Sequence, residues 1–226
     1  DSTNATNNTL IGKDAGTAIT DGDNNTAVGW EALKTNTTGV SNIGIGSGEL
    51  KVNLGGGSNI SIGVYSLYAN TTGSYNVAVG GSALSSNTSG GKNTAVGVSA
   101  LINNSTADCS TAVGYEALYN SSGSHNVAVG YEALKDNQAA QYNVAVGVAA
   151  LTDNTTGTKN TAVGSYNLYK NTTGINNVAV GIDALHNNTT ANDNTAVGAA
   201  ALYTASTGHS NVAVGMEAAK LCTEGY

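Results

Sequence analysis

The chain has 226 residues, of which 30 are glycine and 11 are tyrosine, and it contains no proline, phenylalanine or arginine. Because large apolar side chains supply most of the burial energy of an ordinary globular domain, this composition excludes a thick conventional core. The formal net charge of −7 provides no basic surface, so we expect no nucleic-acid partner. No apolar run approaches the roughly 20 residues of a membrane span, and no segment has the pattern of a signal peptide.

A short motif recurs along the whole chain: Asn, a variable residue, a small residue, Val or Ile, and Gly. Successive copies are 17 residues apart, except for one step of 16. Such spacing predicts a solenoid, in which each coil buries its apolar positions against its neighbours. We expect a single repeat domain over residues 1–226, with regular repeats at about 8–220 and atypical capping units at both ends. The copies begin at Asn8, Asn25, Asn42, Asn59, Asn76, Asn93, Ser110, Asn126, Asn143, Asn160, Asn177, Asn194 and Asn211.

Each repeat predicts three elements in chain order. The run that ends at Gly29 is rich in β-formers and closed by a residue that can bend where a Cβ would obstruct, which indicates one short strand. The next step, which ends at Leu33, is either a β-arc or one helical turn, and we favour the arc. In the Asn-Thr-Thr-Gly segment 36–39, Asn caps the backbone and Gly accepts a positive φ. The predicted fold is all-β, a parallel β-solenoid (β-roll) of about thirteen 17-residue coils, each with one short strand, an arc and a turn.

Alternation along the strand places Ala27 on one face with Asn25, and Thr26 on the other face with Val28. Either the small residues or the Val/Ile residues point out of the coil, and this pattern does not decide which. Both arrangements leave an apolar or closely packing stripe outside, which is typical of an interface. The alternative is an outward alanine stripe with no partner. We name as interface candidates Ala78, Ala95, Ala112, Ala128, Ala145 and Ala162.

The asparagine that starts each motif indicates a structural ladder. Stacked side-chain amides can bond to the equivalent group or backbone of the next coil, which satisfies donors and acceptors together. The alternative is that Asn is only a good turn residue, and its position at the strand entry favours the ladder. Its members are Asn25, Asn42, Asn59, Asn76, Asn93, Asn126, Asn143, Asn160, Asn177, Asn194 and Asn211.

No pattern of reactive side chains predicts catalysis. The three histidines do not recur at a metal-ligand spacing, and the acidic residues two positions after the glycine are explained by a solvated face. We therefore expect no catalytic residue, no metal and no cofactor. Tyrosines gather near the arc, where they either pack over the leucines or contact sugars or proteins. They are Tyr65, Tyr68, Tyr115, Tyr119, Tyr131, Tyr166, Tyr169 and Tyr203.

The repeat units at 25–39, 143–157 and 160–174 resemble repeats of bacteriophage tail fibres and large bacterial surface proteins. The strand motif alone is similar to that of trimeric autotransporter adhesin heads, although the period here is longer. The resemblance covers about residues 8–220. It implies a β-solenoid, commonly trimeric, in an extracellular, cell-surface or virion fibre.

Two function classes follow from these observations. The first is a non-catalytic structural or adhesive fibre module that assembles with itself through the strand face as a homo-oligomer or filament, with cell-surface glycans as a further partner. The second is ice binding through stacked threonine pairs such as Thr37 and Thr38, which Gln138-Ala139 and Leu54-Gly55 interrupt.

Two cysteines, Cys109 and Cys222, lie about seven coils apart in sequence. A disulfide needs Cα atoms within about 7 Å, so one solenoid cannot close this bond on itself. Either both thiols are unpaired, or they form an intermolecular disulfide in an oxidising, extracellular setting.

Overall fold

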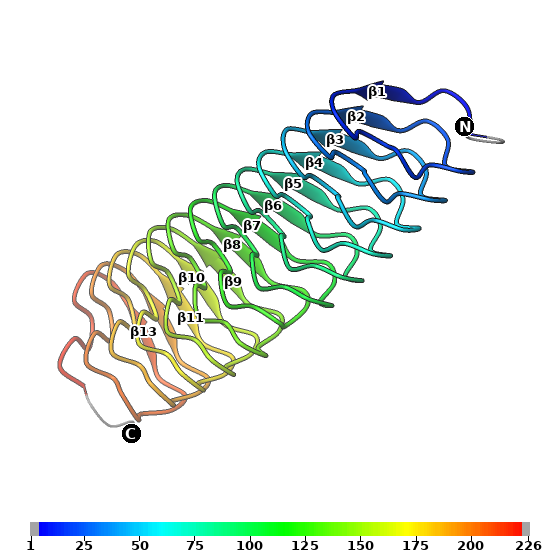
Figure 1. The fold of residues 1–226 in the computed structure, drawn as a ribbon. Helices are drawn as coiled ribbons and strands as arrows, with labels where there is room; N and C mark the ends of the chain where they lie inside the picture. The colour runs from blue at the N-terminus through cyan, green and yellow to red at the C-terminus, as the bar shows by residue number, and fades with distance from the viewer. Residues whose placement is uncertain (1–4, 223–226) are drawn as a thin grey trace. The chain divides into compact units, whose positions relative to one another are not determined.

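The computed structural model describes residues 5–222, and the described chain is all-β with no helix. Thirteen short parallel strands follow one another in chain order in the sheet, one per coil, as Figure 1 shows. Equivalent residues of neighbouring coils pair directly, as Thr26 does with Ile43 and Val28 with Ile45. The predicted β-solenoid with a 17-residue repeat is confirmed.

The chain divides into two compact units, Asp1–Ala112 and Val113–Tyr226, where the sequence predicts one domain. The division falls within the coil that has the 16-residue step. The strands that lie within the first unit are β1 (Thr9–Ile11), β2 (Thr26–Val28), β3 (Ile43–Ile45), β4 (Ile60–Ile62), β5 (Val77–Val79) and β6 (Thr94–Val96). β7 (Thr111–Val113) spans the division. The second unit holds β8 (Val127–Val129), β9 (Val144–Val146), β10 (Thr161–Val163), β11 (Val178–Val180), β12 (Thr195–Val197) and β13 (Val212–Val214).

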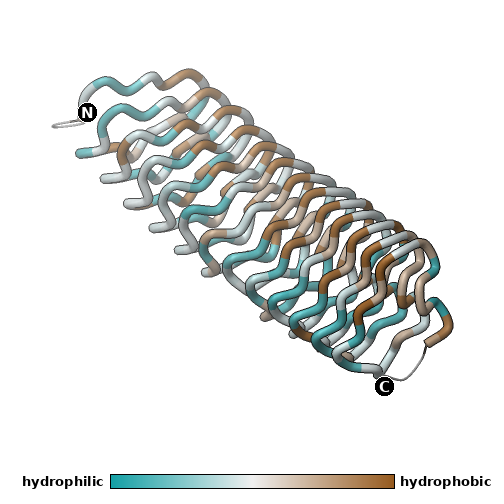
Figure 2. Tube along the Cα trace, turned by 180° about the vertical axis from the view of Figure 1, so that it is seen from behind, coloured by the Kyte–Doolittle hydropathy of each residue, from teal (hydrophilic) through white to brown (hydrophobic). Residues whose placement is uncertain are grey.

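The interior of most coils is filled by one leucine and two small residues. The middle residue of the strand points inward, so Ala78 and Ala128 are fully buried, and the leucine of the arc, such as Leu84, is fully buried as well. Figure 2 shows the hydrophobic positions recurring at the same place in successive coils. Because each coil contributes so little volume, its burial depends on the coils that stack against it.

The arc is built from left-handed backbone and not from a helical turn, which confirms the predicted arc. Gly29 has a φ of 137°, and a Cβ there would lie 1.5 Å from the carbonyl oxygen of Gly46. Glu31 and Leu33 follow with φ values of 56° and 51°. Left-handed backbone costs an L-residue roughly 1–2 kcal/mol, so the burial of the leucine offsets local strain in the coils that carry one.

The glycine of the turn has a different role from the predicted one. Gly39 does not have a positive φ, which corrects the sequence-based expectation. A Cβ at Gly39 would lie 2.4 Å from the carbonyl oxygen of Gly56 and 2.3 Å from Oδ1 of Asn36. The position is therefore small because neighbouring coils approach closely.

The first described coil differs from the others in its interior. Leu10 occupies the strand position that holds alanine in most coils, and Gly16 occupies the position of the buried leucine. A Cβ at Gly16 would lie 2.6 Å from Cδ2 of Leu10, so the large and small residues have exchanged places. This atypical unit agrees with the sequence, but Leu10 and Ile11 are exposed and do not form a polar cap.

Candidate assembly surface

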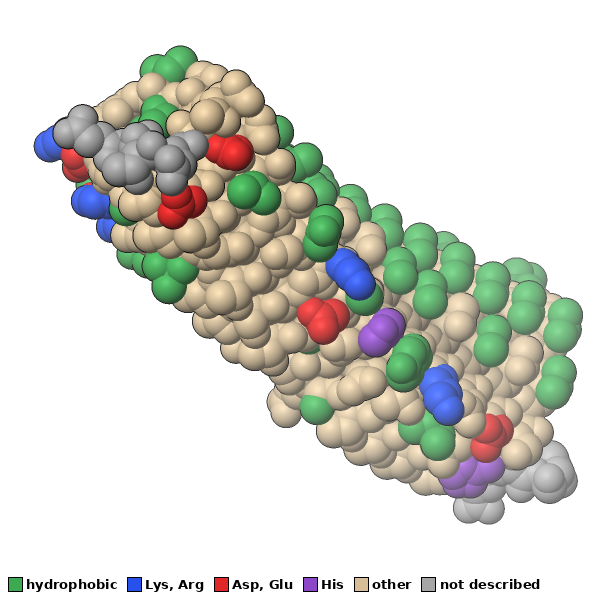
Figure 3. Space-filling model, turned by 90° about the vertical axis from the view of Figure 1, so that its right-hand side faces the viewer, with side chains coloured by type: hydrophobic (Ala, Val, Ile, Leu, Met, Phe, Trp, Pro, Cys, Tyr) green, Lys and Arg blue, Asp and Glu red, His purple; other side chains and the backbone are tan. Residues whose placement is uncertain are grey.

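The outward face of the sheet carries two columns of β-branched side chains. The first and third residues of each strand point out, and in every coil they are Val, Ile or Thr. In the first unit Ile45 and Ile62 remain 39% and 37% exposed, and in the second unit Val163 is 39% exposed. Figure 3 shows hydrophobic side chains in rows on one face of the molecule. Strand spacing of about 4.8 Å makes this a regular apolar surface.

This arrangement corrects the predicted interface residues. All six interface candidates lie inside the coils and have no exposed surface. They are Ala78, Ala95, Ala112, Ala128, Ala145 and Ala162. A partner cannot reach them in this structure. Of the two arrangements that the sequence left open, the structure has the one in which the Val/Ile column faces outward.

Apolar side chains continue this surface past the end of the strand. The residue after the strand glycine is exposed and large in several coils of both units. Trp30, Val64 and Val98 belong to the first unit, and Tyr115, Val148 and Ile182 belong to the second. Exposed apolar residues in contiguous rows mark interaction sites more often than scattered ones do.

The predicted asparagine ladder is present and holds successive coils together. Oδ1 of Asn42 accepts the backbone N–H of Asn59 at 3.0 Å, and Nδ2 of Asn42 donates to the carbonyl of Gly56 at 2.8 Å. The same two bonds recur in the second unit, where Asn177 contacts Asn194 and Ala191. These amides are fully buried, so their bonds replace lost hydration.

A second asparagine ladder runs through the turns, and the sequence analysis assigned its members only to local capping. Nδ2 of Asn70 donates to Oδ1 of Asn53 at 2.8 Å, and to the carbonyl of Gly73 at 3.0 Å. In the second unit Asn171 repeats this pattern with Asn154. The recurrence of Asn eleven residues after the first ladder, at Asn36, Asn53 and Asn70, was the signal for it.

The threonine pairs do not present two equivalent hydroxyls to solvent. The first threonine donates its hydroxyl to the next coil, as Thr71 does to the carbonyl of Thr88 at 2.9 Å and Thr155 to that of Thr172 at 2.9 Å. The second threonine, such as Thr38, is exposed. Half of each pair is therefore used for cohesion between coils.

Aromatic rings near the arc stack on one another. In the second unit the ring of His186 lies between those of Tyr169 and Tyr203, with centroids 5.3 and 5.1 Å away and nearly parallel planes. Tyr115 and Tyr131 stack at 5.5 Å. Sugar stacking needs an exposed ring face. Neighbouring rings cover both faces of His186, whereas Tyr115 and Tyr131 stay 46% and 50% exposed.

Ion pairs at the arc join neighbouring coils. Lys51 contacts Glu31 at 2.6 Å and lies 5.6 Å above the ring of Trp30. Lys34 and then Lys51 hold the pKa of Glu31 below its ordinary value. In the second unit Lys135 bonds Glu116 and Glu132, both at 2.7 Å, and these bonds raise the pKa of Lys135. Such partly exposed pairs contribute little to stability.

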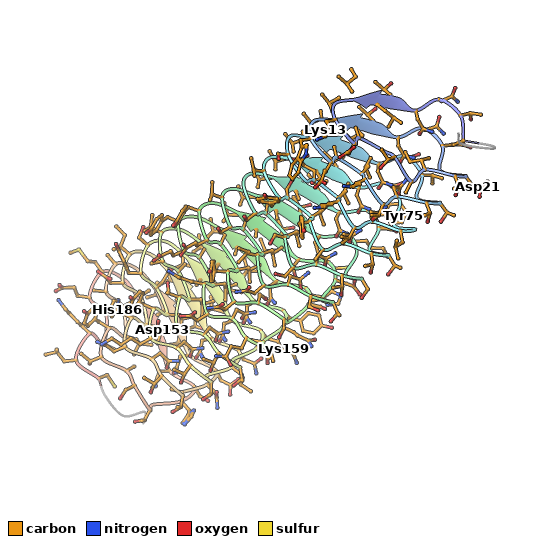
Figure 4. The ribbon with its side chains drawn as sticks, viewed as in Figure 1. Lys13, Asp21, Tyr75, Asp153, Lys159 and His186 are labelled. Atoms are coloured by element: carbon orange, nitrogen blue, oxygen red, sulfur yellow. The ribbon has the colours of Figure 1, made fainter. Side chains whose placement is uncertain are left out.

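The remaining polar side chains do not converge on one site. Figure 4 shows Asp153 and His186 on one side of the second unit and Lys159 on the other. Nδ1 of His186 lies 3.2 Å from Asp183 Oδ1. Among residues 5–222 no group of three or more His, Cys, Asp or Glu side chains has a metal-binding arrangement. That stretch also has no helix long and apolar enough to cross a membrane.

One ionisable group lies in the coil interior. Most coils place alanine at both small interior positions, but the third coil has Gly44 and Glu49, and the fourth has Ser61 and Ser66. The two serine hydroxyls bond each other at 2.6 Å. Glu49 is fully buried, neither carboxyl oxygen has a hydrogen-bond partner in the described chain, and burial raises its pKa to about 7.

The cysteines do not form a disulfide within the described residues. Cys109 is exposed in the first unit, and Cys222 is half-buried in the second.

Comparison of the chain with protein-family models, curated proteins and solved structures found no match. The resemblance to fibre and adhesin repeats therefore stays a prediction from the sequence.

Proposed function

We propose that this protein is a non-catalytic structural module of an extracellular, cell-surface or virion fibre, which assembles with further copies of itself through the outward face of its sheet. The observation that carries the proposal is the pair of outward columns, which are β-branched in every coil. Burying these columns against a second sheet face would stabilise assembly by roughly 25 cal/mol per Å² of apolar surface. The resemblance of the repeats to those of phage fibres and adhesins supports the cellular setting.

The test places charge on the outward face and compares it with the same charge elsewhere. Val146→Lys with Val163→Lys adds two cations to the face, and Thr156→Lys with Thr173→Lys adds them to exposed turn positions of the same coils. We expect the wild-type chain and the threonine variant to sediment as oligomers and the valine variant to sediment as a monomer. A wild-type chain that is monomeric at every concentration would contradict the proposal.

A disulfide between chains would join copies of the protein covalently. Cys109 is exposed and can meet a partner without unfolding. Mass spectrometry without reductant should show covalent dimers that Cys109→Ser abolishes. Dimers that persist in this variant would assign the bridge to Cys222 alone.

The two other functions expected from the sequence have weaker support. Ice binding relied on threonine pairs, and the first hydroxyl of each pair is engaged by the next coil. Glycan binding relied on tyrosines, and some of their ring faces are covered by neighbouring rings. Thermal hysteresis and glycan-array binding, respectively, measure these activities directly.

A further inference from the structure

Side-chain size alternates along the column of residues that directly follow the strand glycines, which we call the rim column. Its large members are open to solvent, as Val64 is at 52% exposed and Val148 at 41% exposed. From the second coil of the first unit the rim column reads Trp30, Ser47, Val64, Gly81 and Val98, and in the second unit it continues with Val148, Ser165, Ile182 and Ala199 after two tyrosines. In these two stretches every second coil carries a large side chain beside the outward face.

Backbone hydrogen bonds fix the position of each rim residue relative to the neighbouring coil. In the first unit the N–H of Ser82 donates to the carbonyl of Val64 at 2.9 Å, and in the second unit the N–H of Asp183 donates to the carbonyl of Ser165 at 3.0 Å. Since parallel strands are about 4.8 Å apart, large rim residues recur about every 10 Å. A second surface with this spacing packs closely when its large residues stand against small positions.

The rim columns of two copies meet in only one of the two symmetric ways of packing the outward faces together. A two-fold axis along the strands reverses the direction in which the coils follow one another, but it keeps the glycine ends of the strands on the same side. The two rim columns then face each other. A two-fold axis along the stacking direction of the coils places the rim columns on opposite sides, so the alternation would have no partner.

The two units carry the alternation in opposite phase. The phase changes at Tyr115 and Tyr131, which are large and occupy consecutive coils. Counting outward from the coil of Tyr115, the first coils on either side hold Val98 and Tyr131, and both of these residues are large. The next four pairs of coils each combine one small and one large residue: Gly81 with Val148, Val64 with Ser165, Ser47 with Ile182, and Trp30 with Ala199.

We propose that two copies of this chain pack their outward faces antiparallel, about a two-fold axis at the coil of Tyr115, so that rim residues of the first unit of one copy meet those of the second unit of the other. This inference rests on the proposed function, because it specifies the partner and the register of the same face. Each match of large against small then occurs twice in the dimer. Other antiparallel registers also match sizes, but this one sets Trp30, the largest residue of the column, against Ala199.

The register is tested by filling a small position and then removing the large residue that should face it. Ser165→Tyr and Val64→Gly use residue types that the rim column already contains at Tyr131 and Gly81, so we expect both variants to fold. Ser165→Tyr should raise the dissociation constant of the dimer by about ten- to a hundredfold, because it overpacks a contact that occurs twice. Adding Val64→Gly to the same chain should restore most of the lost affinity.

Val98→Gly is the matched control, because it is the same change two coils away, at the position that would face Ser165 if the axis lay one coil further along the chain. It should not restore the affinity of Ser165→Tyr. Restoration by Val98→Gly, or by neither glycine variant, would overturn the proposal. Sedimentation over a range of concentrations gives the dissociation constants, and circular dichroism with melting temperatures checks the fold of each variant.

The wild-type chain separates this inference from the proposed function. A wild-type chain that is monomeric at every concentration would contradict both. Wild-type oligomers that Val146→Lys with Val163→Lys abolishes, but for which Val64→Gly does not rescue Ser165→Tyr, would contradict the antiparallel register alone.

Discussion

Oδ1 of Asn59 accepts the backbone N–H of Asn76 at 2.9 Å, while Nδ2 of the same Asn59 donates to the carbonyl of Gly73 at 2.9 Å. One side chain therefore satisfies backbone groups at both ends of the segment that leads into the next strand. All three residues are buried, so water cannot substitute for the amide. This double contact is what makes the first asparagine ladder a structural element and not a turn preference.

Asn59→Ala should destabilise the chain measurably. It leaves a buried N–H at Asn76 and a carbonyl at Gly73 that has lost this donor, at about 1–3 kcal/mol for each buried group without a partner. Chemical denaturation followed by circular dichroism measures the loss. Asn59→Ser is the control, since Ser110 occupies this column naturally, and it should cost less. Equal stability of the alanine variant and the wild-type chain would contradict a cohesive role for the ladder.

Glu49 should contribute less to the stability of the chain as pH rises. Its pKa is about 7 in the folded state and about 4.5 unfolded, so the folded chain binds more protons between these values. The contribution of Glu49 to stability is then highest below about pH 4.5, declines through the window from 4.5 to 7, and is lowest above it. The full difference is on the order of 3 kcal/mol.

The measurement is the free energy of unfolding of the wild-type chain and of Glu49→Gln, taken from pH 4 to pH 8. Subtracting the two curves removes the contributions of other groups, such as Glu31, whose pKa is lowered and whose contribution has the opposite sign. The difference should decrease with pH across this window. A flat difference would mean that the carboxyl is not desolvated in the fold.

Ala128→Leu and Ala145→Leu should each destabilise the second unit by about 1–3 kcal/mol, because both alanines are fully buried and extra methylenes overpack the coil. Val129→Leu is the matched control, since Val129 is the outward neighbour of Ala128. Thermal melting should separate the inward changes from the outward one. If all three variants melted together, the alanine column would have no packing role.

The period and the residue classes were enough to predict the solenoid, the strand positions and the first asparagine ladder. The direction of the alanine column remained open, because alternation assigns residues to two faces without saying which face is inside. A signal did exist: Asn25 shares a face with Ala27, and an amide ladder of this kind requires burial. Treating the two columns together would have placed the alanines inside and the valines outside.

The left-handed arc could not have been predicted from the residues. Leu84 has a φ of 52°, a conformation that a leucine rarely adopts, and its sequence neighbours give no sign of it. Tertiary packing outweighs the local preference at this position, because the buried leucines of the arc share this conformation from coil to coil. The polar interior at Glu49 was equally hidden, because this position, three residues after the strand glycine, holds alanine in most coils.

Ser82→Gly should stabilise the chain, which tests whether the left-handed arc stores strain. Ser82 has a φ of 58°, and the equivalent residue of another coil is Gly48, with a φ of 73°. Relief of roughly 1–2 kcal/mol of steric cost is partly offset by the greater freedom of glycine in the unfolded chain, at about 0.5–1 kcal/mol. We expect a net gain of up to about 1 kcal/mol.

Ser86→Gly is the matched control within the same coil, because Ser86 lacks a positive φ and is also half-buried. It should lose about 0.5–1 kcal/mol, since only the entropic cost remains. Denaturant unfolding should therefore show shifts of opposite sign in the free energy of unfolding of the two variants. A lower free energy of unfolding in both would show that Ser82 stores no strain.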